Sequence, residues 1–388
     1  MFKQSKISRV AKREFKRILE RKTLYFLIII LPMFIFLLIG SIYKNEIMRE
    51  LPAAVIDYDH TQLSRTAVQM FESSGSIAIK EHLVSLDEIK KEFRRGKIQC
   101  AIIIPNNFEK DVKSGKQTSI TVYKNSSNVI VGSLLLKEAS TIIKTISAGV
   151  QLKKIQSSGH TKDEAMNIMM PIKLDTHSLY NPNYSYVNYF VPGLVTFILQ
   201  MMIMIASVLI ISSEFAHETF GEVVELSGGS EMSILFGKAI PHILINSASA
   251  FLIVGIIFPL FGVIVNGSYL LILSLFILFI IVCVMFGIMI SSLFKDQFMA
   301  TEVAVFINTP GFIFSGFTFP LWGMPVIHNI FGNMMPYTHF LSAYIKLSQM
   351  NTRLFAVKYD LIILTSFLIV SVVVSLFMIR MRVKKYEK

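Results

Sequence analysis

The chain has 388 residues, of which 53% are hydrophobic and only 16% are charged, and its mean hydropathy is +0.57. In soluble proteins roughly a quarter of all residues are charged, so this composition excludes a wholly soluble protein and a disordered one. Lysine and arginine outnumber aspartate and glutamate by 38 to 26, which gives a net charge of +12. In a membrane protein such an excess gathers beside the cytoplasmic ends of the spans, so nucleic acid is not expected as a partner.

The first 22 residues predict a basic amphipathic helix at the membrane surface. Apolar and basic residues each recur at three and four positions, which places them on different faces of one helix. An anchor held by membrane lipid and a docking site for a partner are both compatible with this pattern. The apolar face comprises Ile7, Val10, Ala11, Phe15 and Ile18, and the basic face Lys6, Arg9, Arg13 and Lys16.

Six membrane spans are predicted from long apolar runs. Residues Thr23–Tyr43 are 21 uncharged residues, which as a helix of about 1.5 Å per residue cross the ~30 Å hydrocarbon core. This run is too long for the apolar part of a cleaved signal peptide. The other spans are predicted at 189–213, 239–265, 269–294, 300–320 and 361–379, with a turn at Asn266–Ser268 between the third and the fourth.

Both ends of the chain are predicted to be cytoplasmic, because basic residues crowd the first 22 residues and the tail at 380–388. An even number of spans agrees with this orientation. Residues 44–186 then lie outside, 214–238 form a cytoplasmic loop, and 321–360 form an outer re-entrant segment and loop. The predicted fold class is an α-helical polytopic membrane protein with an N-terminal interfacial helix and an inserted α/β extracytoplasmic domain.

The outer segment has the pattern of a small α/β layer. Short buried strands are expected at 53–56 and 100–104, and helices at 62–73 and 86–95. From Val129 to Met170 the spacing is mostly helical, with Gly159 interrupting it. Asp57 and Asp59 follow a strand end, and we interpret them as turn or helix-capping residues, because no further ligand stands at a metal-site spacing.

Several motifs that carry chemistry are absent from the sequence. It has no G-x-x-x-x-G-K-[ST] loop, no G-x-S-x-G elbow, no H-E-x-x-H helix and no C-x-x-C pair. We therefore expect no catalytic residues, no metal site and no cofactor bound by this chain. If the protein performs energetic work, another chain must supply the energy.

Four glutamates after the second span predict an acidic stripe on a short cytoplasmic helix. They stand four, four and three residues apart, so they share one helix face. Like charges at this spacing disfavour an isolated helix, which suggests a basic partner, although a solvated face explains them too. Gly228 and Gly229 should end the helix. The four residues are Glu214, Glu218, Glu222 and Glu225.

The fifth span ends in a run of helix breakers and small residues. Freed backbone carbonyls at membrane depth must be covered by protein or line a cavity, so short re-entrant helices are expected on the outer side. A structural role and contact with a transported molecule are both compatible with this segment. The candidate residues of a pathway or gate are Pro310, Phe312, Ser315, Gly316, Phe319 and Pro320.

A set of short motifs extends over nearly the whole chain. The motifs are Lys12-Arg13-Glu14-Phe15 with Pro32, Val55-Ile56-Asp57-Tyr58-Asp59 with Leu63-Ser64-Arg65, Arg95-Gly96-Lys97 with Ile104-Pro105 and Phe108, Asn181-Pro182, Val191-Pro192-Gly193, Gly237-Lys238, Ser315-Gly316-Phe317, Phe319-Pro320, Met324-Pro325 and Pro336. In their order and spacing they resemble the permease subunits of ABC exporters of the ABC-2 type, in the branch with a large outer domain between the first two spans. The acidic loop reads His217-Glu218-Thr219-Phe220-Gly221-Glu222 and lacks the Gly-Thr pair usual in the family.

The resemblance implies a bacterial inner-membrane protein without an ATPase site of its own. A separate ABC ATPase subunit, which binds ATP and Mg, would contact Lys12, Arg13 and Glu14 and the four glutamates of the acidic loop. A second permease, identical or related, would complete the pathway, and a periplasmic adaptor protein is left open. Export of amphipathic, lipid-like or drug-like molecules is implied. The alternative is a membrane-anchored envelope receptor or assembly factor that acts through its outer domain without transport.

Overall fold

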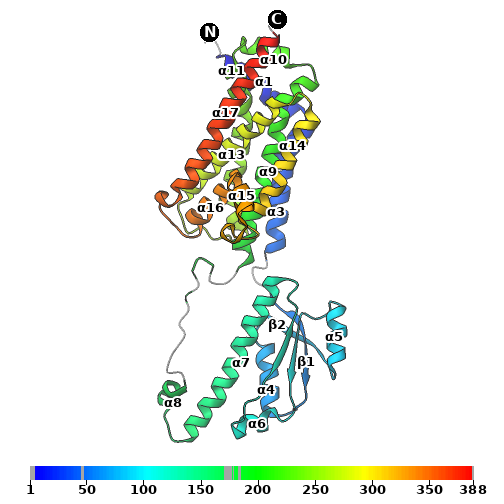
Figure 1. The fold of residues 1–388 in the computed structure, drawn as a ribbon, viewed down its shortest axis with the longest axis vertical. Coiled ribbons are helices and arrows are strands. Elements are labelled where there is room, and N and C mark those ends of the chain that lie inside the picture. The colour runs from blue at the N-terminus through cyan, green and yellow to red at the C-terminus, as the bar shows by residue number, and fades with distance from the viewer. Residues whose placement is uncertain (1–4, 45–47, 170–176, 178, 182–184, 387–388) are drawn as a thin grey trace. The chain divides into compact units, whose positions relative to one another are not determined.

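The computed structural model describes residues 5–44, 48–169, 177, 179–181 and 185–386 (Figure 1). Contacts divide the chain into two units. One unit comprises Met1–Glu46 and Ser178–Lys388, and we call it the helical unit. The other comprises Ile47–His177, and we call it the α/β unit.

The helical unit is built from α-helices joined by short turns. Two of its helices contain a π-helical turn: η1 lies between α2 and α3, and η2 lies between α11 and α12. In chain order the elements are α1 (Lys6–Glu20), α2 (Lys22–Tyr25), η1 (Phe26–Ile30), α3 (Leu31–Tyr43), α9 (Tyr186–Ala216), α10 (Phe220–Ser227), α11 (Glu231–Leu252), η2 (Ile253–Ile257), α12 (Phe258–Leu260), α13 (Tyr269–Leu293), α14 (Gln297–Phe314), η3 (Leu321–Gly323), α15 (Val326–Asn333), α16 (Pro336–Ser348), η4 (Leu354–Val357) and α17 (Lys358–Tyr386).

Five helical segments of the described residues are long and apolar enough to cross a membrane, so the chain is a polytopic membrane protein. The predicted span at 300–320 corresponds to α14, which is not among the five. Glu302, Asn308 and Pro310 lie inside α14 and lower its hydropathy. The predicted count of six spans is therefore not confirmed. The five segments are Phe26–Tyr43, Tyr186–Ala216, Glu231–Leu260, Tyr269–Leu293 and Leu354–Tyr386.

Two breaks predicted from glycine and polar residues are confirmed. Helix α10 ends at Ser227, and Gly228 and Gly229 follow with positive φ angles of 57° and 72°, a conformation that favours glycine. The turn Asn266–Ser268 separates α12 from α13, and the Asn266 amide donates to the Ser348 carbonyl at 2.8 Å. These turns bring the helices on either side back into the same bundle.

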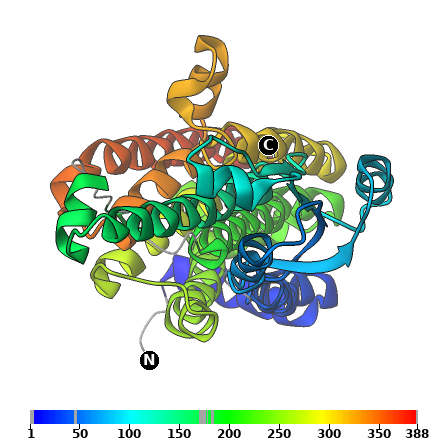
Figure 2. The ribbon, with the colours of Figure 1, turned by 90° about the horizontal axis from the view of Figure 1, so that it is seen from below.

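Helices α9 and α13 form the centre of the helical unit. They pack against each other, while α3 contacts α9 and α17 contacts α13, so α3 and α17 lie on opposite sides of the bundle (Figures 1 and 2). A methyl group on Gly287 of α13 would come within 2.4 Å of the Ser207 Cβ of α9. Small residues thus permit the close approach of the two helices, as is usual for membrane helices.

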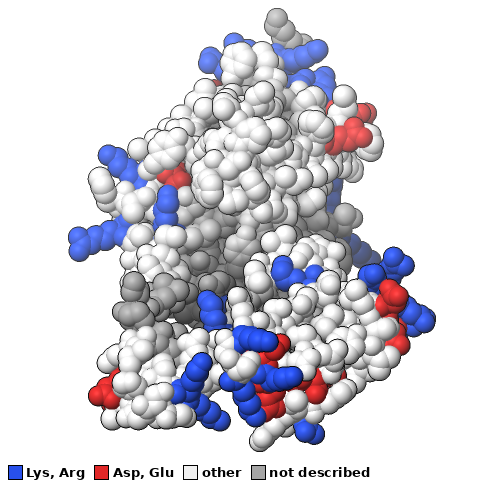
Figure 3. Space-filling model, turned by 60° about the horizontal axis from the view of Figure 1, so that its bottom comes forward, with Lys and Arg blue, Asp and Glu red and all other residues white. Residues whose placement is uncertain are grey.

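Charged side chains are distributed unevenly over the molecule. The flank of the helical unit seen in Figure 3 is largely uncharged, whereas lysine and arginine gather near its far end and over the α/β unit. An uncharged flank suits contact with lipid tails. Helix α1 and the C-terminal end of α17 lie at the same end of the helical unit (Figure 1), where the rings of Phe220 and Tyr386 are 5.2 Å apart.

The α/β unit contains a four-stranded mixed sheet in the order β2-β1-β3-β4. Strand β1 pairs in parallel with β2 and β3, and β3 pairs antiparallel with β4. The predicted strands and helices of this segment are confirmed, including the interruption at Gly159 between α7 and α8. The elements are β1 (Leu51–Asp57), α4 (Gln62–Glu72), β2 (Ile77–His82), α5 (Leu86–Arg94), β3 (Cys100–Ile104), α6 (Phe108–Ser114), β4 (Thr121–Lys124), α7 (Val129–Ser157) and α8 (Lys162–Met169).

The central strand β1 is buried on both faces because its side chains alternate between two cores. Ala53 and Val55 face α4 and α7, whereas Ala54 and Ile56 face α5. The predicted turn and capping role of Asp57 and Asp59 is confirmed. The Asp57 carboxylate accepts from the backbone amides of Asp59 and His60, and Asp59 Oδ2 accepts from the Glu109 amide at 2.9 Å.

Candidate functional site

A cluster of buried ionic side chains joins α1, α9 and α11 at the end of the helical unit that carries α1. Its centre is Glu214, on the last turn of α9, whose side chain is fully buried. The Glu214 carboxylate accepts hydrogen bonds from Lys238 Nζ at 2.5 Å, from Arg13 Nη1 at 2.8 Å and from Arg17. The Arg17 guanidinium also donates to the Ser213 hydroxyl and to the Leu209 carbonyl.

A second carboxylate, Glu14 of α1, completes the cluster. Its Oε2 accepts from Lys238 Nζ at 2.6 Å, and its Oε1 lies 3.2 Å from Nε2 of His242. Lys238 is fully buried and bridges the two carboxylates. Burying an ion is costly unless it is paired, and here two carboxylates face the ammonium of Lys238 and the guanidinium of Arg17.

Helical spacing positions these side chains. Glu14 and Arg17 are three residues apart on α1 and share its buried face with Val10. Lys238 and His242 are four residues apart on α11, and both are buried. Gly237 allows the helices to approach, since a methyl group there would come within 2.6 Å of the Val10 Cβ.

The short helix α10 is tied to the same cluster. Arg13 spans the two helices, because its Nη2 donates to Glu222 Oε2 at 2.9 Å while its Nη1 reaches Glu214. Thr219, just before α10, donates its hydroxyl proton to the Glu214 carboxylate. Helix α10 is thereby linked to the end of α9 and to α1 within one hydrogen-bonded network.

The electrostatic environment of Glu14 keeps it ionised. Burial by itself raises the pKa of this carboxyl group, but the Lys238 ammonium, the hydrogen bond from His242 and the charge of Arg17 outweigh burial and hold the pKa well below its usual range. The cluster therefore keeps a carboxylate at Glu14 throughout the physiological pH range.

A pH-dependent contribution to stability follows from the lowered pKa of Glu14. The folded chain has the lower pKa, so ionised Glu14 stabilises the fold above the unfolded pKa of about 4.3 and loses this effect as the pH falls below it. We expect the gap in melting temperature between wild type and Glu14→Gln to be constant from about pH 8 to pH 6 and to shrink towards about pH 4. Thermal unfolding of the detergent-solubilised chain measures it, and a gap that widened on acidification would contradict the assignment.

The predicted acidic stripe on one cytoplasmic helix is wrong. Glu214 belongs to α9, Glu218 lies in the turn after it with a positive φ of 56°, and Glu222 and Glu225 belong to α10. The turn breaks the spacing on which the stripe depended. Glu214 and Glu222 are compensated by basic residues of the same chain, whereas Lys12, Glu218 and Glu225 are exposed and contact none of the described cluster residues.

The segment after α14 brings some of the predicted pathway residues together. Pro310 lies inside α14, and the half-buried Phe312 packs against Phe197 and Phe317 with ring centroids 4.7 and 5.3 Å apart. Ser315 is buried, and its hydroxyl donates to the Phe312 carbonyl at 2.8 Å. Phe319 and Pro320 are exposed and lie outside this aromatic group, near the predicted short helices, α15 and α16.

Gly316 has a backbone conformation that residues with a side chain rarely adopt. Its φ is +85°, and an added Cβ would lie 3.1 Å from the Leu321 Cγ. We expect Gly316→Ala to destabilise the chain by about 1–3 kcal/mol through backbone strain. Gly311→Ala is the matched control, because its Cβ would meet only the Met335 sulfur at 3.8 Å. Thermal unfolding of both variants in detergent measures the difference, and equal stability of the two would remove the strain at Gly316 from consideration.

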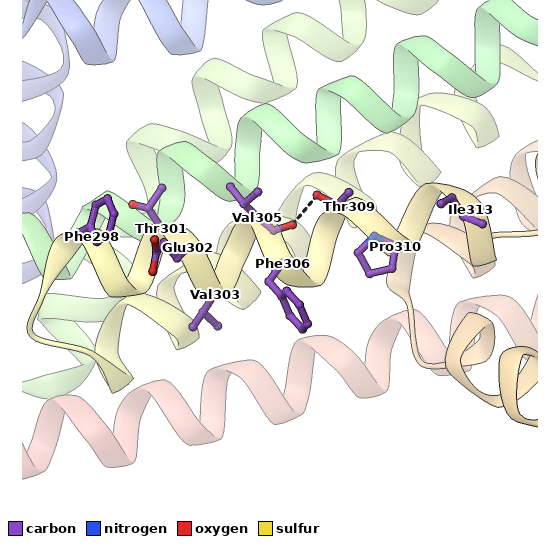
Figure 4. Close-up of a pocket in the computed structure, with 9 residues that line it drawn as sticks. All are labelled: Phe298, Thr301, Glu302, Val303, Val305, Phe306, Thr309, Pro310 and Ile313. Atoms are coloured by element: carbon purple, nitrogen blue, oxygen red, sulfur yellow. Dashed lines mark hydrogen bonds between the residues drawn. The ribbon is translucent and has the colours of Figure 1, made fainter.

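One face of α14 is left without a packing partner among the described residues. The opposite face is buried at Ala300, Ala304, Asn308 and Gly311. Helix α14 packs on α9 there, and Asn308 Oδ1 accepts from Gln200 Nε2 of α9 at 2.8 Å. The open face borders a pocket of about 910 Å³ (Figure 4). Its lining comes from α14 alone: Phe298, Thr301, Glu302, Val303, Val305, Phe306, Thr309, Pro310 and Ile313.

Comparison with known proteins decides the family. A family model described as "ABC-2 family transporter protein" matches residues 22–377. The chain belongs to the ABC-2 transporter family. The region that matches the family model contains Glu214 and Lys238, whereas the cluster residues of α1 lie before residue 22, where this region begins.

Individual ABC-2 relatives cover most of the chain at low identity. "Probable multidrug ABC transporter permease YbhS" of Escherichia coli K12 is 20% identical over 346 residues, 85% of each chain. "Probable multidrug ABC transporter permease YbhR" of the same organism is 22% identical over 313 residues, 81% of this chain and 82% of that one. "ABC transporter G family member 20" of Dictyostelium discoideum is 21% identical over 305 residues, 78% of this chain and 37% of that protein.

The sequence of this ABC-2 chain did not reveal all members of the ionic cluster. Arg13, Glu14 and Glu214 were predicted as coupling residues, but Arg17, Lys238 and His242 were not placed with them. One signal was available: Lys238 and His242 stand one helical turn apart where the third predicted span begins. Ionisable side chains at such a position are expected to pair within the bundle.

Proposed function

We propose that this chain is the membrane-spanning subunit of an ATP-driven exporter in a bacterial inner membrane. The observation that carries the proposal is the buried ionic cluster, which ties the surface helix α1 and the loop helix α10 to the ends of α9 and α11. A membrane anchor that transports nothing has no need of such a linkage. In an exporter this linkage would transmit a movement of α1 or α10 to the spans α9 and α11.

The proposed orientation places this cluster in the cytoplasm. The basic flanks of α1 and of the tail support cytoplasmic ends by the positive-inside rule. Two ends on one side need an even number of crossings, so α14 is the sixth span in the proposal, with the residues at 44–186 outside. The helix breaker Pro310, which is part of the pocket lining, is compatible with a span that lines a cavity rather than facing lipid.

A separate ATPase subunit supplies the energy in this proposal, and it holds ATP and Mg. It contacts the exposed sides of α1 and α10, where Lys12, Glu218 and Glu225 remain free to pair with it. Hydrolysis then moves these helices, and the cluster transmits the movement to α9 and α11. A conformational change of this kind favours export only if the transported molecule binds the two states unequally.

A second permease completes the pathway in this proposal. The open face of α14 supports a paired arrangement, because an apolar helix face with exposed Phe298 and Phe306 needs either lipid or another protein surface. Two such faces across a two-fold axis would enclose a space for an amphipathic or drug-like molecule on its way outward. The relatives named as multidrug permeases are compatible with this substrate class.

Purification of the complex tests the proposal. The full chain is affinity-purified from its native membrane in mild detergent, and the accompanying proteins are identified by mass spectrometry. We expect a stoichiometric partner that carries a G-x-x-x-x-G-K-[ST] loop and hydrolyses ATP. Recovery of no ATPase, under conditions that preserve other membrane complexes, would overturn the exporter assignment.

A further inference from the structure

The pocket along α14 contains one charged side chain. Glu302 is exposed on the open face, one helical turn from Phe298 and one turn from Phe306 (Figure 4). The other polar groups of the lining are threonines, and the Thr309 hydroxyl already donates to the Val305 carbonyl at 2.8 Å. Within the described part of the chain, the Glu302 carboxylate has no ion pair or hydrogen bond.

An uncompensated carboxylate on an apolar face is costly in a membrane. Ionisable residues within a bilayer face a bundle interior or an aqueous cavity, and they pair with an opposite charge there. The neighbours of Glu302 provide no such charge, since Phe298 is 71% exposed and Phe306 is 80% exposed beside it. The arrangement therefore lacks a cation and presents aromatic surface on both sides of the place where one would sit.

A second copy of the chain would not supply the missing charge by symmetry. In a two-fold contact the same patch of both subunits meets, so the open face of one α14 would bring its Glu302 towards the Glu302 of the other. Two carboxylates that approach in an apolar space repel each other. The paired face would thus be more negative than the single one, and a positively charged guest would relieve the repulsion.

We propose that the α14 face is a binding site for lipophilic organic cations, with Glu302 as the residue that selects their charge. This inference rests on the proposed exporter function and names the class of molecule that the exporter transports. Phe298 and Phe306 would hold the apolar body of the molecule and its charge by cation–π contact. The carboxylate attracts the charge without a formal bond, so cations of different shape are accepted.

The depth of Glu302 agrees with such a substrate. It is the sixth residue of α14, about 8 Å from the start of the helix at ~1.5 Å per residue. Helix α14 starts near the end that carries the ionic cluster, since Arg382 Nη2 of α17 donates to the Leu293 carbonyl there at 3.2 Å. In the proposed orientation this is the cytoplasmic leaflet, whose negative surface potential concentrates lipophilic cations.

Two ions of the same size and opposite charge test the site. The full chain is purified in lipid nanodiscs, and binding of tetraphenylphosphonium and of tetraphenylborate is measured by equilibrium dialysis. After subtraction of the binding to empty nanodiscs of the same lipid, we expect the chain to bind the cation at least about tenfold more tightly than the anion, because one uncompensated carboxylate favours the one and repels the other. Equal affinities for the two ions, or no binding of the cation, would overturn the proposal.

Variants assign the preference to Glu302. Glu302→Gln should weaken tetraphenylphosphonium binding about tenfold and leave tetraphenylborate unchanged or tighter, whereas Glu302→Asp should keep most of the preference. Glu231→Gln is the matched control, since Glu231 lies in the first turn of α11 and outside the pocket. Full cation binding by Glu302→Gln would overturn the assignment.

The test is independent of the ATPase. If Glu302→Gln does not fold, the comparison of the two ions on the wild-type chain still decides the charge preference. A chain that co-purifies with an ATPase but shows no charge preference would keep the exporter function and lose this substrate class. A chain that prefers the cation but recovers no ATPase would lose the exporter function and keep the site.

Discussion

Replacing Lys238 with methionine is expected to lower the free energy of unfolding by roughly 3–5 kcal/mol, the usual cost of removing one partner from a buried ion pair. Methionine keeps an unbranched chain of similar length but removes the ammonium group. Glu14 and Glu214 would then face each other across the space that Nζ occupies, 2.6 and 2.5 Å from their oxygens. Thermal unfolding in detergent and the amount of protein in the membrane measure the effect.

An exposed lysine provides the matched control for this prediction. Lys16 lies on α1, with its Nζ 3.5 Å from Glu20 Oε1, and both side chains are more than 60% exposed. Lys16→Met should change stability by less than about 1 kcal/mol, as expected for a solvated pair. Adding Glu14→Gln to Lys238→Met should recover part of the loss, because the one carboxylate that remains, Glu214, keeps Arg13 and Arg17 as partners. Equal stability of Lys238→Met and Lys16→Met would show that the cluster is not held by its charges.

A role in positioning α1 explains the ionic cluster better than a contribution to the stability of the fold. An apolar group of the same shape packs as well as a buried ion pair and often stabilises a fold more. Charged partners differ from apolar ones in directionality: Lys238 meets Glu14 only when α1 lies in one register against α11. We infer that this ion pair fixes the position of α1, which the proposed transmission of movement from α1 to the spans would require.

The sequence was sufficient to predict features that depend on local pattern. Five of the six apolar runs correspond to helices able to cross a membrane, because a run of that length without charge has few other structures. The α/β elements were found because strand and helix periods differ, as at Cys100–Ile104 and Leu86–Arg94. Glycine breaks at Gly159 and Gly228 were found for the same local reason.

Features that depend on the packing of distant segments were missed. Glu14 and Lys238 are 224 residues apart, and nothing in the spacing of either helix indicates that they meet. The acidic stripe failed because the spacing of four glutamates was extrapolated through the turn at Glu218, where the backbone leaves the helix. The open face of α14 was missed because a helix pattern does not reveal which of its faces finds a neighbour.

In the proposed exporter, replacing Arg13 with glutamine is expected to uncouple transport from ATP hydrolysis. Glu214 would keep Lys238 and Arg17 as partners, so the buried carboxylate stays compensated and the stability cost should be about 2 kcal/mol or less. Arg13 is the side chain that joins Glu214 to Glu222, and its loss removes this bridge between α9 and α10, while the Thr219 hydroxyl still donates to Glu214. We expect export of a fluorescent cation such as ethidium to fall about tenfold, within the usual range of coupling free energies, while the ATPase remains bound and active.

Three further variants distinguish the loss of coupling from a mere change in charge. Arg9→Gln removes an exposed guanidinium from the same helix and should transport normally. Glu222→Gln cuts only the arm that reaches α10 and should reproduce part of the Arg13 effect, whereas Glu225→Gln, three residues further on the same helix and exposed, should not. Each of the four variants removes one charge, but only Arg13→Gln and Glu222→Gln break the ion pair between α1 and α10, so only these two should lower export per ATP hydrolysed. Equal export by all four would mean that movement of α10 reaches the spans by another route.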